Sequence, residues 1–172
     1  IKVSMDGVGD VYNYIRRDGD WDNVYNNMKV LNNEPTINLA VGITVQSHNI
    51  FHMPEFYKFW KESPVFLQFI TANILQTPKY LRPNLWPDEY RELIIKKLEE
   101  AEQEFPAMKK FITYMKSNDT VIRDYAKMRK YTRDIEGRYK LDIDLKSLVR
   151  SHLGVKLEGM DIVNERIINE KR

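Results

Sequence analysis

The hydrophobic residues in the first 71 positions fall into two kinds of pattern, continuous runs and helical spacing. The opening residues "IKVS" have the pattern of the end of a strand, and residues 37–45 form a β-branched, nearly continuous apolar run. Such a run is typical of a strand that is buried on both faces. A third run, "PVFLQFI", begins at Pro64 and predicts another strand.

Two segments between these strands have the spacing of helices. In "DWDNVYNNMKVL" apolar residues recur every three or four positions, Asp20 is a candidate N-cap, and "NNEP" predicts the end of the helix. In "MPEFYKFWKES" Pro54 suits the first turn, and the aromatic residues supply an apolar surface. The order β-α-β-α-β predicts an α/β fold with a parallel sheet and right-handed crossovers.

The remainder of the chain predicts helices alone. Four segments have helical patterns: "PDEYRELIIKKLEEAEQEF", "AMKKFITYMKS", "NDTVIRDYAKMRKYTRDIEGRYK" and "DLKSLVRSHLG". Asn118 or Asp119 is the expected cap of the third helix, and Gly154 closes the fourth. Three prolines between positions 77 and 87 mark the change of pattern. We therefore predict an α/β segment over residues 1–75 and an all-helical C-terminal extension over residues 76–172.

Composition narrows the class of protein. Apolar residues make up 42% of the 172 residues, enough for a hydrophobic core, and the net charge of +2 gives little support for a nucleic-acid partner. The sequence holds no cysteine, so this chain alone forms no disulfide and no thiolate-held zinc or iron–sulfur site. It has no run of about 18 apolar residues and no signal segment, so we expect no membrane partner and a cytoplasmic location.

The predicted sheet has an exposed edge. Its first strand is short, and three parallel strands alone would leave unpaired backbone N–H and C=O groups along that strand. We therefore expect either further strands before Ile1 or a partner chain on this edge. In the first case the sequence is the back half of a larger fold, either split or trimmed.

Polar residues follow each predicted strand, at the edge where parallel α/β folds bind ligands. "SMDGVGD", "TVQSHN" and "FITAN" follow the three strands in turn. Ser4 and Asp6 offer a hydroxyl and a carboxylate for ribose hydroxyls or a ligand amine, and Arg16 offers a guanidinium for a carboxylate or phosphate. In a purely structural alternative, Ser4 is a cap, Asp6 forms a turn and Arg16 is solvated. Spacing alone leaves both interpretations open.

Three further patterns favour no site. "GVGDVY" lacks the third glycine of a dinucleotide-binding fingerprint. "DGDWD" has the acidic spacing of a calcium loop, but Asn23 stands in place of the required glycine and Lys29 in place of the required glutamate. His48 and His52 are four residues apart, yet they precede Pro54 in a predicted loop and have no evident third ligand. We therefore predict no metal site.

The string "KVSMDGVGDVYNYIR" resembles the fourth strand and following turn of radical S-adenosylmethionine (SAM) enzymes, especially members with a SPASM or twitch extension. Their pattern there is V-S-[IL]-D-G, with an arginine twelve residues after the serine, and Ser4 and Arg16 match that spacing. "INLAVGITVQSHNI" resembles the fifth strand and "VFLQFITAN" the sixth. The resemblance covers residues 1–75 well and the remaining residues weakly.

The resemblance implies a fold and a ligand. The fold would be half of a partial parallel (β/α) barrel, contributing strands four to six, with the helices in the position of a twitch extension. The ligand would be SAM. By resemblance, Ser4 contacts the ribose, Arg16 the carboxylate, and the exit of the sixth strand, ending at Asn73, the adenine. Asp6 would assist Ser4, and substrate would lie near Gln46 and Asn49.

The chain also departs from the family. The C-x-x-x-C-x-x-C loop that binds a [4Fe–4S] cluster is absent, as are cysteines for an auxiliary cluster. The resemblance therefore implies a C-terminal portion that positions SAM and substrate, with the cluster in a missing N-terminal half, and no activity as this chain alone. The alternative is a catalytically inactive binding or assembly module, derived from or paired with such a half. Neither reading identifies the substrate, and a peptide or protein is among the open classes.

Overall fold

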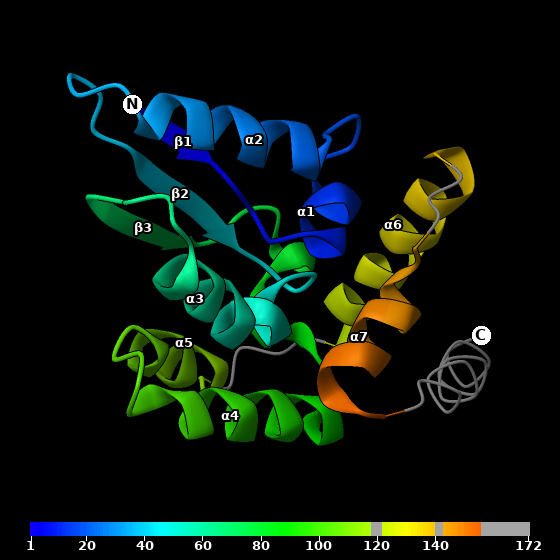
Figure 1. The fold of residues 1–172 in the computed structure, drawn as a ribbon. Coiled ribbons are helices and arrows are strands. Elements are labelled where there is room, and N and C mark those ends of the chain that lie inside the picture. Colours follow the sequence, from blue (N-terminus) through cyan, green and yellow to red (C-terminus); the bar gives the residue numbers. More distant parts are fainter. Residues whose placement is uncertain (118–121, 140–142, 156–172) are drawn as a thin grey trace, which may run out of the picture.

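The computed structural model describes residues 1–117, 122–139 and 143–155, and within them the chain is a mixed α/β protein (Figure 1). Its three strands are β1 (Lys2–Ser4), β2 (Ala40–Val45) and β3 (Phe69–Ile74). They lie side by side in the order β1-β2-β3, and both neighbouring pairs are parallel. The predicted parallel sheet, with helices between its strands, is therefore confirmed, although two helices and not one connect β1 to β2.

Strand register assigns each residue to one of two faces. Ser4 lies beside Gly42, and Gly42 lies beside Thr71, so these three form one row on one face. Val41 and Ile43 alternate onto the other face and are at most 1% exposed. Strands paired in chain order through right-handed crossovers place their connecting helices on one side of the sheet. The face of Val41 and Ile43 is therefore the helix-covered face.

The crossover helices are α1 (Asp10–Ile15), α2 (Trp21–Asn32) and α3 (Met53–Glu62). The Asp20 side chain accepts a hydrogen bond from the Asn23 backbone N–H at 3.1 Å, which confirms the predicted N-cap of α2. Trp21 then stacks on Tyr25, with ring centroids 5.4 Å apart, and meets Phe59 of α3 edge-on at 5.3 Å. This aromatic cluster joins the two crossovers above the sheet.

Two strand predictions need correction. Residues 64–68 are not in a strand, and β3 begins only at Phe69. The preceding segment is a connection: the Phe66 backbone N–H donates to the Asn32 side chain at 2.9 Å, and Val65 is buried beneath it. In addition, β2 is not buried on both faces, because Gly42 and Thr44 are only half-buried. Within residues 1–117, 122–139 and 143–155, no helix covers their side of the sheet.

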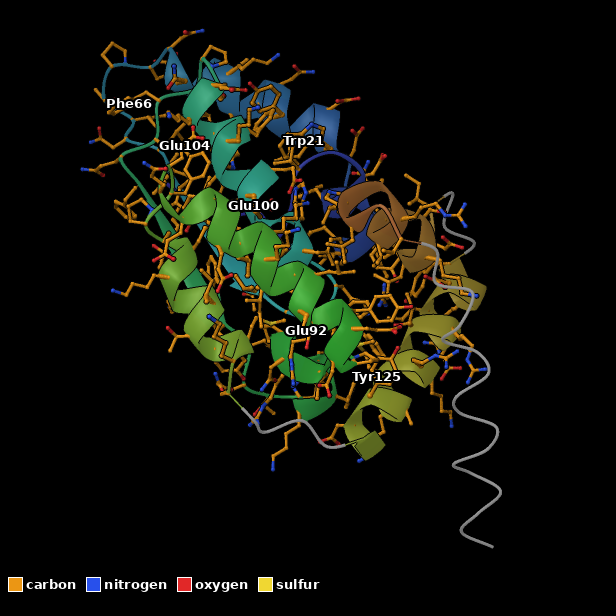
Figure 2. All side chains as sticks on the ribbon, turned by 90° about the horizontal axis from the view of Figure 1, so that it is seen from below. Trp21, Phe66, Glu92, Glu100, Glu104 and Tyr125 are labelled. Carbon is orange, nitrogen blue, oxygen red and sulfur yellow. The ribbon has the colours of Figure 1, made fainter. Side chains whose placement is uncertain are left out.

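The helical extension begins with an antiparallel pair, α4 (Asp88–Glu102) and α5 (Met108–Met115). Figure 2 shows Glu92 and Glu100 on the outward side of α4, and both are exposed. Lys110 of α5 donates to the Ala72 carbonyl at 2.8 Å. This contact ties α5 to the outer edge of β3.

The extension continues with α6 (Ile122–Tyr139) and α7 (Leu145–Leu153). The predicted caps Asn118 and Asp119 lie outside the described residues. Gly154 ends α7 in the left-handed region with φ +67°, as predicted from the sequence. In Figure 1, α6 and α7 stand beyond the end of the sheet toward which the strands run.

Buried side chains from residues 1–75 and from residues 76–155 join one hydrophobic core. The fully buried Trp86 shows the connection: its indole N–H donates to the Ser47 carbonyl at 3.0 Å, and its ring meets Phe51 edge-on. The short 3₁₀ turns Ile50–His52, Lys79–Leu81 and Pro83–Leu85 carry the contacts between the strand exits and α6 and α7. Among the helices in the described ranges, none is both long enough and apolar enough to cross a membrane.

Candidate functional site

The face of the sheet that none of the described helices covers carries mostly polar side chains. Because alternate residues share a face, its members follow from the register. They are Lys2, Ser4, Ala40, Gly42, Thr44, Phe69, Thr71 and Asn73. Lys2, Ser4 and Asn73 are exposed, and the two threonines are half-buried. This surface, the open face below, presents hydroxyl, amide and ammonium groups on three adjacent strands.

Asp6 fastens the end of β1 to β2. Its Oδ1 accepts a hydrogen bond from the Thr44 backbone N–H at 2.8 Å, and its Oδ2 lies 2.8 Å from Nε of Arg16. The Asp6 side chain is only 10% exposed, whereas that of Arg16 is 40% exposed. The carboxylate is therefore committed to protein groups, and it orients a guanidinium that remains open to solvent.

Asn49 completes this fastening from the loop after β2. Its Nδ2 donates to the Asp6 carbonyl at 2.8 Å and to the Thr44 carbonyl at 3.0 Å, and its Oδ1 accepts from the Gln46 N–H at 2.7 Å. Asn49 is completely buried, and Gln46 is half-buried beside it. In this arrangement the Asn49 side chain joins backbone groups and does not face solvent.

Four of the six predicted site residues fall into two groups, whereas Gln46 and Asn49 belong to the loop described above. Ser4 and Asn73 lie on the open face, where both are exposed. Asp6 and Arg16 meet directly at the carboxyl end of β1. Asp6 also joins Thr44 and Asn49 in a buried polar group. The sequence indicated Asp6 and Asn49 as ligand-contacting residues and gave no indication of the Thr44 contact.

A second polar cluster attaches α6 to the strand exits. Within it, Nε2 of the buried His48 lies 2.9 Å from the Thr132 hydroxyl. The Tyr14 hydroxyl donates to Glu136 at 3.0 Å, and the same Glu136 oxygen accepts the Leu145 backbone N–H at 2.8 Å. Burial is the main cause that raises the pKa of Tyr14 far above its ordinary value, and the Glu136 charge adds to it.

Arg17 joins the same cluster from the end of α1. Its Nη2 donates to the Tyr131 hydroxyl at 3.2 Å, and its guanidinium carbon lies 4.7 Å from the centre of the Tyr139 ring. Burial, with the Arg17 charge as a smaller cause, lowers the pKa of His48 to about 4. The neutral His48 is thus suited to its place between two aromatic rings, Tyr14 and Tyr131.

His52 and His152 form a third cluster with Glu55, and their ligand atoms lie within 4.8 Å of one another. His152 is 100 residues from its partner, so no spacing rule could have predicted the pair. The rings share a hydrogen bond of 2.9 Å between His52 Nδ1 and His152 Nε2. Their outer nitrogens also have partners: His52 Nε2 accepts the Val8 N–H at 3.1 Å, and His152 Nδ1 lies 2.7 Å from the Leu148 carbonyl.

These partners fix the tautomers and argue against a metal ion. The Val8 N–H needs a lone pair on His52 Nε2, so the ring proton is on Nδ1 and points at His152. A metal bound at Nδ1 would need a lone pair there, which would place the proton on Nε2 facing another donor. One carboxylate oxygen of Glu55, Oε1, is already paired with Lys97. The cluster therefore fits a chain of neutral hydrogen bonds better than a metal site.

An apolar groove lies at the other end of β3. Its volume is about 550 Å³, and it is lined by residues that include Tyr57, Phe66, Phe69 and Phe105. Phe66 is 75% exposed, and Figure 2 shows it near Glu104, at the opposite end of the molecule from Tyr125. Because β3 begins at Phe69, this groove is separate from the polar groups at the strand exits.

Comparisons with known proteins found no matching family model, no matching curated protein and no matching solved structure.

Proposed function

We propose that this chain forms one wall of a SAM-binding site, as the C-terminal portion of a radical SAM partial barrel, and that it positions SAM and substrate. The observation that supports the proposal best is the open face, because Ser4 and Asn73 share it and no helix in the described part of the chain covers it. Parallel strands in chain order, with helices on one side, are also the arrangement expected of a barrel segment. In such a barrel the open face would be the inner wall.

The donor set suits the polar parts of SAM. In this proposal the Ser4 hydroxyl binds a ribose hydroxyl, and Asn73 offers an amide to the adenine. Arg16 binds the carboxylate, and Asp6 orients the guanidinium for it through the ion pair. Asn49 supports the site from beneath by holding the ends of β1 and β2 together.

The chain's residues do not fit a [4Fe–4S] cluster, because the sequence contains no cysteine. In this proposal the cluster and the first barrel strands belong to a separate N-terminal half that pairs with the outer edge of β1. The contribution of this chain is positioning, and the reaction chemistry would come from the cofactors. Accordingly, we expect no SAM cleavage by this chain alone.

Calorimetric titration of the chain with SAM and with S-adenosylhomocysteine tests the proposal. Ser4→Ala and Arg16→Met should each weaken binding by about tenfold or more, since each removes a hydrogen bond or charge contact. Thr36→Ala and Arg138→Met, both at exposed positions, are the matched controls and should bind as the wild type does. Absence of binding at millimolar ligand, or equal binding by all five proteins, would contradict the proposal.

A second candidate, an assembly module without SAM binding, is favoured by a different observation. At the exit of β2, His48 and His52 are already in contact with α6 and α7, so part of the strand-end region is occupied by the chain itself. The free edge of β1 would then bind a partner strand. Light scattering should show a complex or dimer that Lys2→Pro abolishes, because the Lys2 N–H points away from β2. A monomer with SAM affinity would favour the first candidate.

A further inference from the structure

All three histidines of the sequence lie at one interface, between the exit of β2 and the last two helices. His48 contacts Thr132 of α6, and His52 contacts His152 of α7. His48 and His52 are 4% and 5% exposed. We propose that this interface is a proton-sensitive latch, which holds α7, and with it α6, against the β2 exit when the histidines are neutral and releases them in acid.

The first support is the direction of the hydrogen bonds. Val8 N–H donates to His52, His52 donates to His152, and His152 donates to the Leu148 carbonyl, so every ring nitrogen of the pair is in use. A proton added to His52 Nε2 would face the Val8 N–H, and a proton added to His152 Nε2 would face the His52 N–H. Either protonation replaces a hydrogen bond by two opposed donors.

The charged groups around the pair act in opposite directions, and burial adds to the effect of Lys97. Lys97 of α4 donates to the His152 carbonyl at 2.9 Å, and it is paired with Glu55 of α3. Its charge therefore opposes a second positive charge nearby, while Glu55 favours one at His152. Burial is the largest cause, and together with the neighbouring charges of His152 and Lys97 it lowers the pKa of His52 to about 3. Burial is also the largest cause that lowers the pKa of His152.

The sign of the pH effect follows from these shifts. A histidine whose pKa is lower in the docked state stabilises docking above its ordinary pKa of about 6.5, and that stabilisation is lost as the pH falls. If His52 becomes exposed when α7 undocks, its protonation alone raises the equilibrium constant for undocking, the opening constant, about 30-fold between pH 8 and pH 5. His152 and His48 increase this dependence when the same opening exposes them. The latch is independent of the proposed function and of whether SAM binds.

Hydrogen exchange measured by mass spectrometry between pH 8 and pH 5, corrected for the intrinsic exchange rate, tests the latch. On acidification the hydrogen-exchange protection of α7 should fall about 30-fold or more. This loss should come before any loss of protection in α2 and α5. His152→Gln keeps an acceptor for the His52 N–H, but glutamine does not titrate. In this variant the equilibrium constant for opening of α7 should therefore depend less steeply on pH, because up to one fewer proton is taken up on opening. Arg150→Gln, on the same helix, is the control and should keep the wild-type pH dependence.

NMR titration of the wild type gives a readout that needs no variant. The ring signals of His52 should show no protonation in the folded protein between pH 8 and pH 5, and new signals of an opened form should appear instead. Titration of His52 with an ordinary pKa while α7 stays protected would overturn the proposal. So would equal pH dependence in the wild type and His152→Gln. Stabilisation of α7 by Zn²⁺ at pH 7.5, lost in His152→Gln, would overturn it in favour of a metal site.

Discussion

The Asn49 side chain donates a hydrogen bond to the Asp6 carbonyl at 2.8 Å, which joins the loop after β2 to the segment that follows β1. The same amide group also serves Thr44 and Gln46, so one buried side chain satisfies three backbone groups. The ends of the two strands are therefore held by polar contacts in a completely buried position.

Asn49→Ala should lower the free energy of unfolding by about 3 kcal/mol, because it leaves a buried N–H and two carbonyls without their partner. Urea denaturation monitored by tryptophan fluorescence measures this. Asn26→Ala, at an exposed position of α2, is the control and should change stability by less than about 0.5 kcal/mol. A cost below about 1 kcal/mol for Asn49→Ala would show that water replaces the amide.

Replacements of Asp6 separate its two contacts. Asp6→Asn keeps an acceptor for the Thr44 N–H and removes the charge opposite Arg16, whose side chain is 40% exposed, so it should cost only about 0.5–1 kcal/mol. Asp6→Ala also leaves the Thr44 N–H unpaired and should cost about 2 kcal/mol. A double-mutant cycle with Arg16→Met measures the ion pair. Equal costs for the two Asp6 variants would mean that the charge, not the backbone contact, dominates.

Two glycines should respond to alanine in opposite ways. Gly137 lies in α6 with no atom within 4 Å of an added Cβ, so Gly137→Ala should raise stability by about 0.5–1 kcal/mol. At Gly19 an added Cβ would lie 2.5 Å from the Arg16 carbonyl oxygen, so Gly19→Ala should destabilise the turn between α1 and α2. Thermal unfolding of both variants checks the contrast. A higher melting temperature for Gly19→Ala would contradict the predicted clash between the added Cβ and the Arg16 carbonyl oxygen.

Tyr14 should make the fold sensitive to alkali. Its pKa in the folded protein is raised, so its contribution is present below the ordinary tyrosine pKa of about 10 and is lost as the pH rises above it. The loss amounts to about 1.4 kcal/mol per pH unit above that value. Urea denaturation between pH 8 and pH 11 measures the effect. Tyr14→Phe should flatten the curve, although burial also raises the pKa of Tyr57 and of Tyr90. An unchanged slope in that variant would contradict the assignment.

Local signals in the sequence gave most of the elements. The Asp20 cap, the helix that begins after it and the Gly154 stop depend on neighbouring residues, and the structure has them as predicted. The start of β3 was predicted too early, because an apolar run does not reveal that Phe66 is held by Asn32 of another element. The start of β3 therefore depends on a tertiary contact and not on the local sequence alone.

The candidate site was predictable only in part. The positions of Ser4 and Asn73 on one face follow from counting along parallel strands, once the register is known. The burial of Asn49 and the contact between His52 and His152 depend on how distant segments pack, and they leave no periodic trace in the sequence. The resemblance to radical SAM enzymes stays a proposal that ligand binding must test.

The open face also determines what kind of contact can cover it. Around Ser4, Thr44, Thr71 and Asn73 it offers little apolar area to be removed from water, because its exposed aromatic member, Phe69, lies at the start of β3. A ligand or chain that covers these groups has to match each donor and acceptor. An unmatched group would lose its hydration without gaining a hydrogen bond in return. Association there should therefore be selective and enthalpic, with a small change in heat capacity.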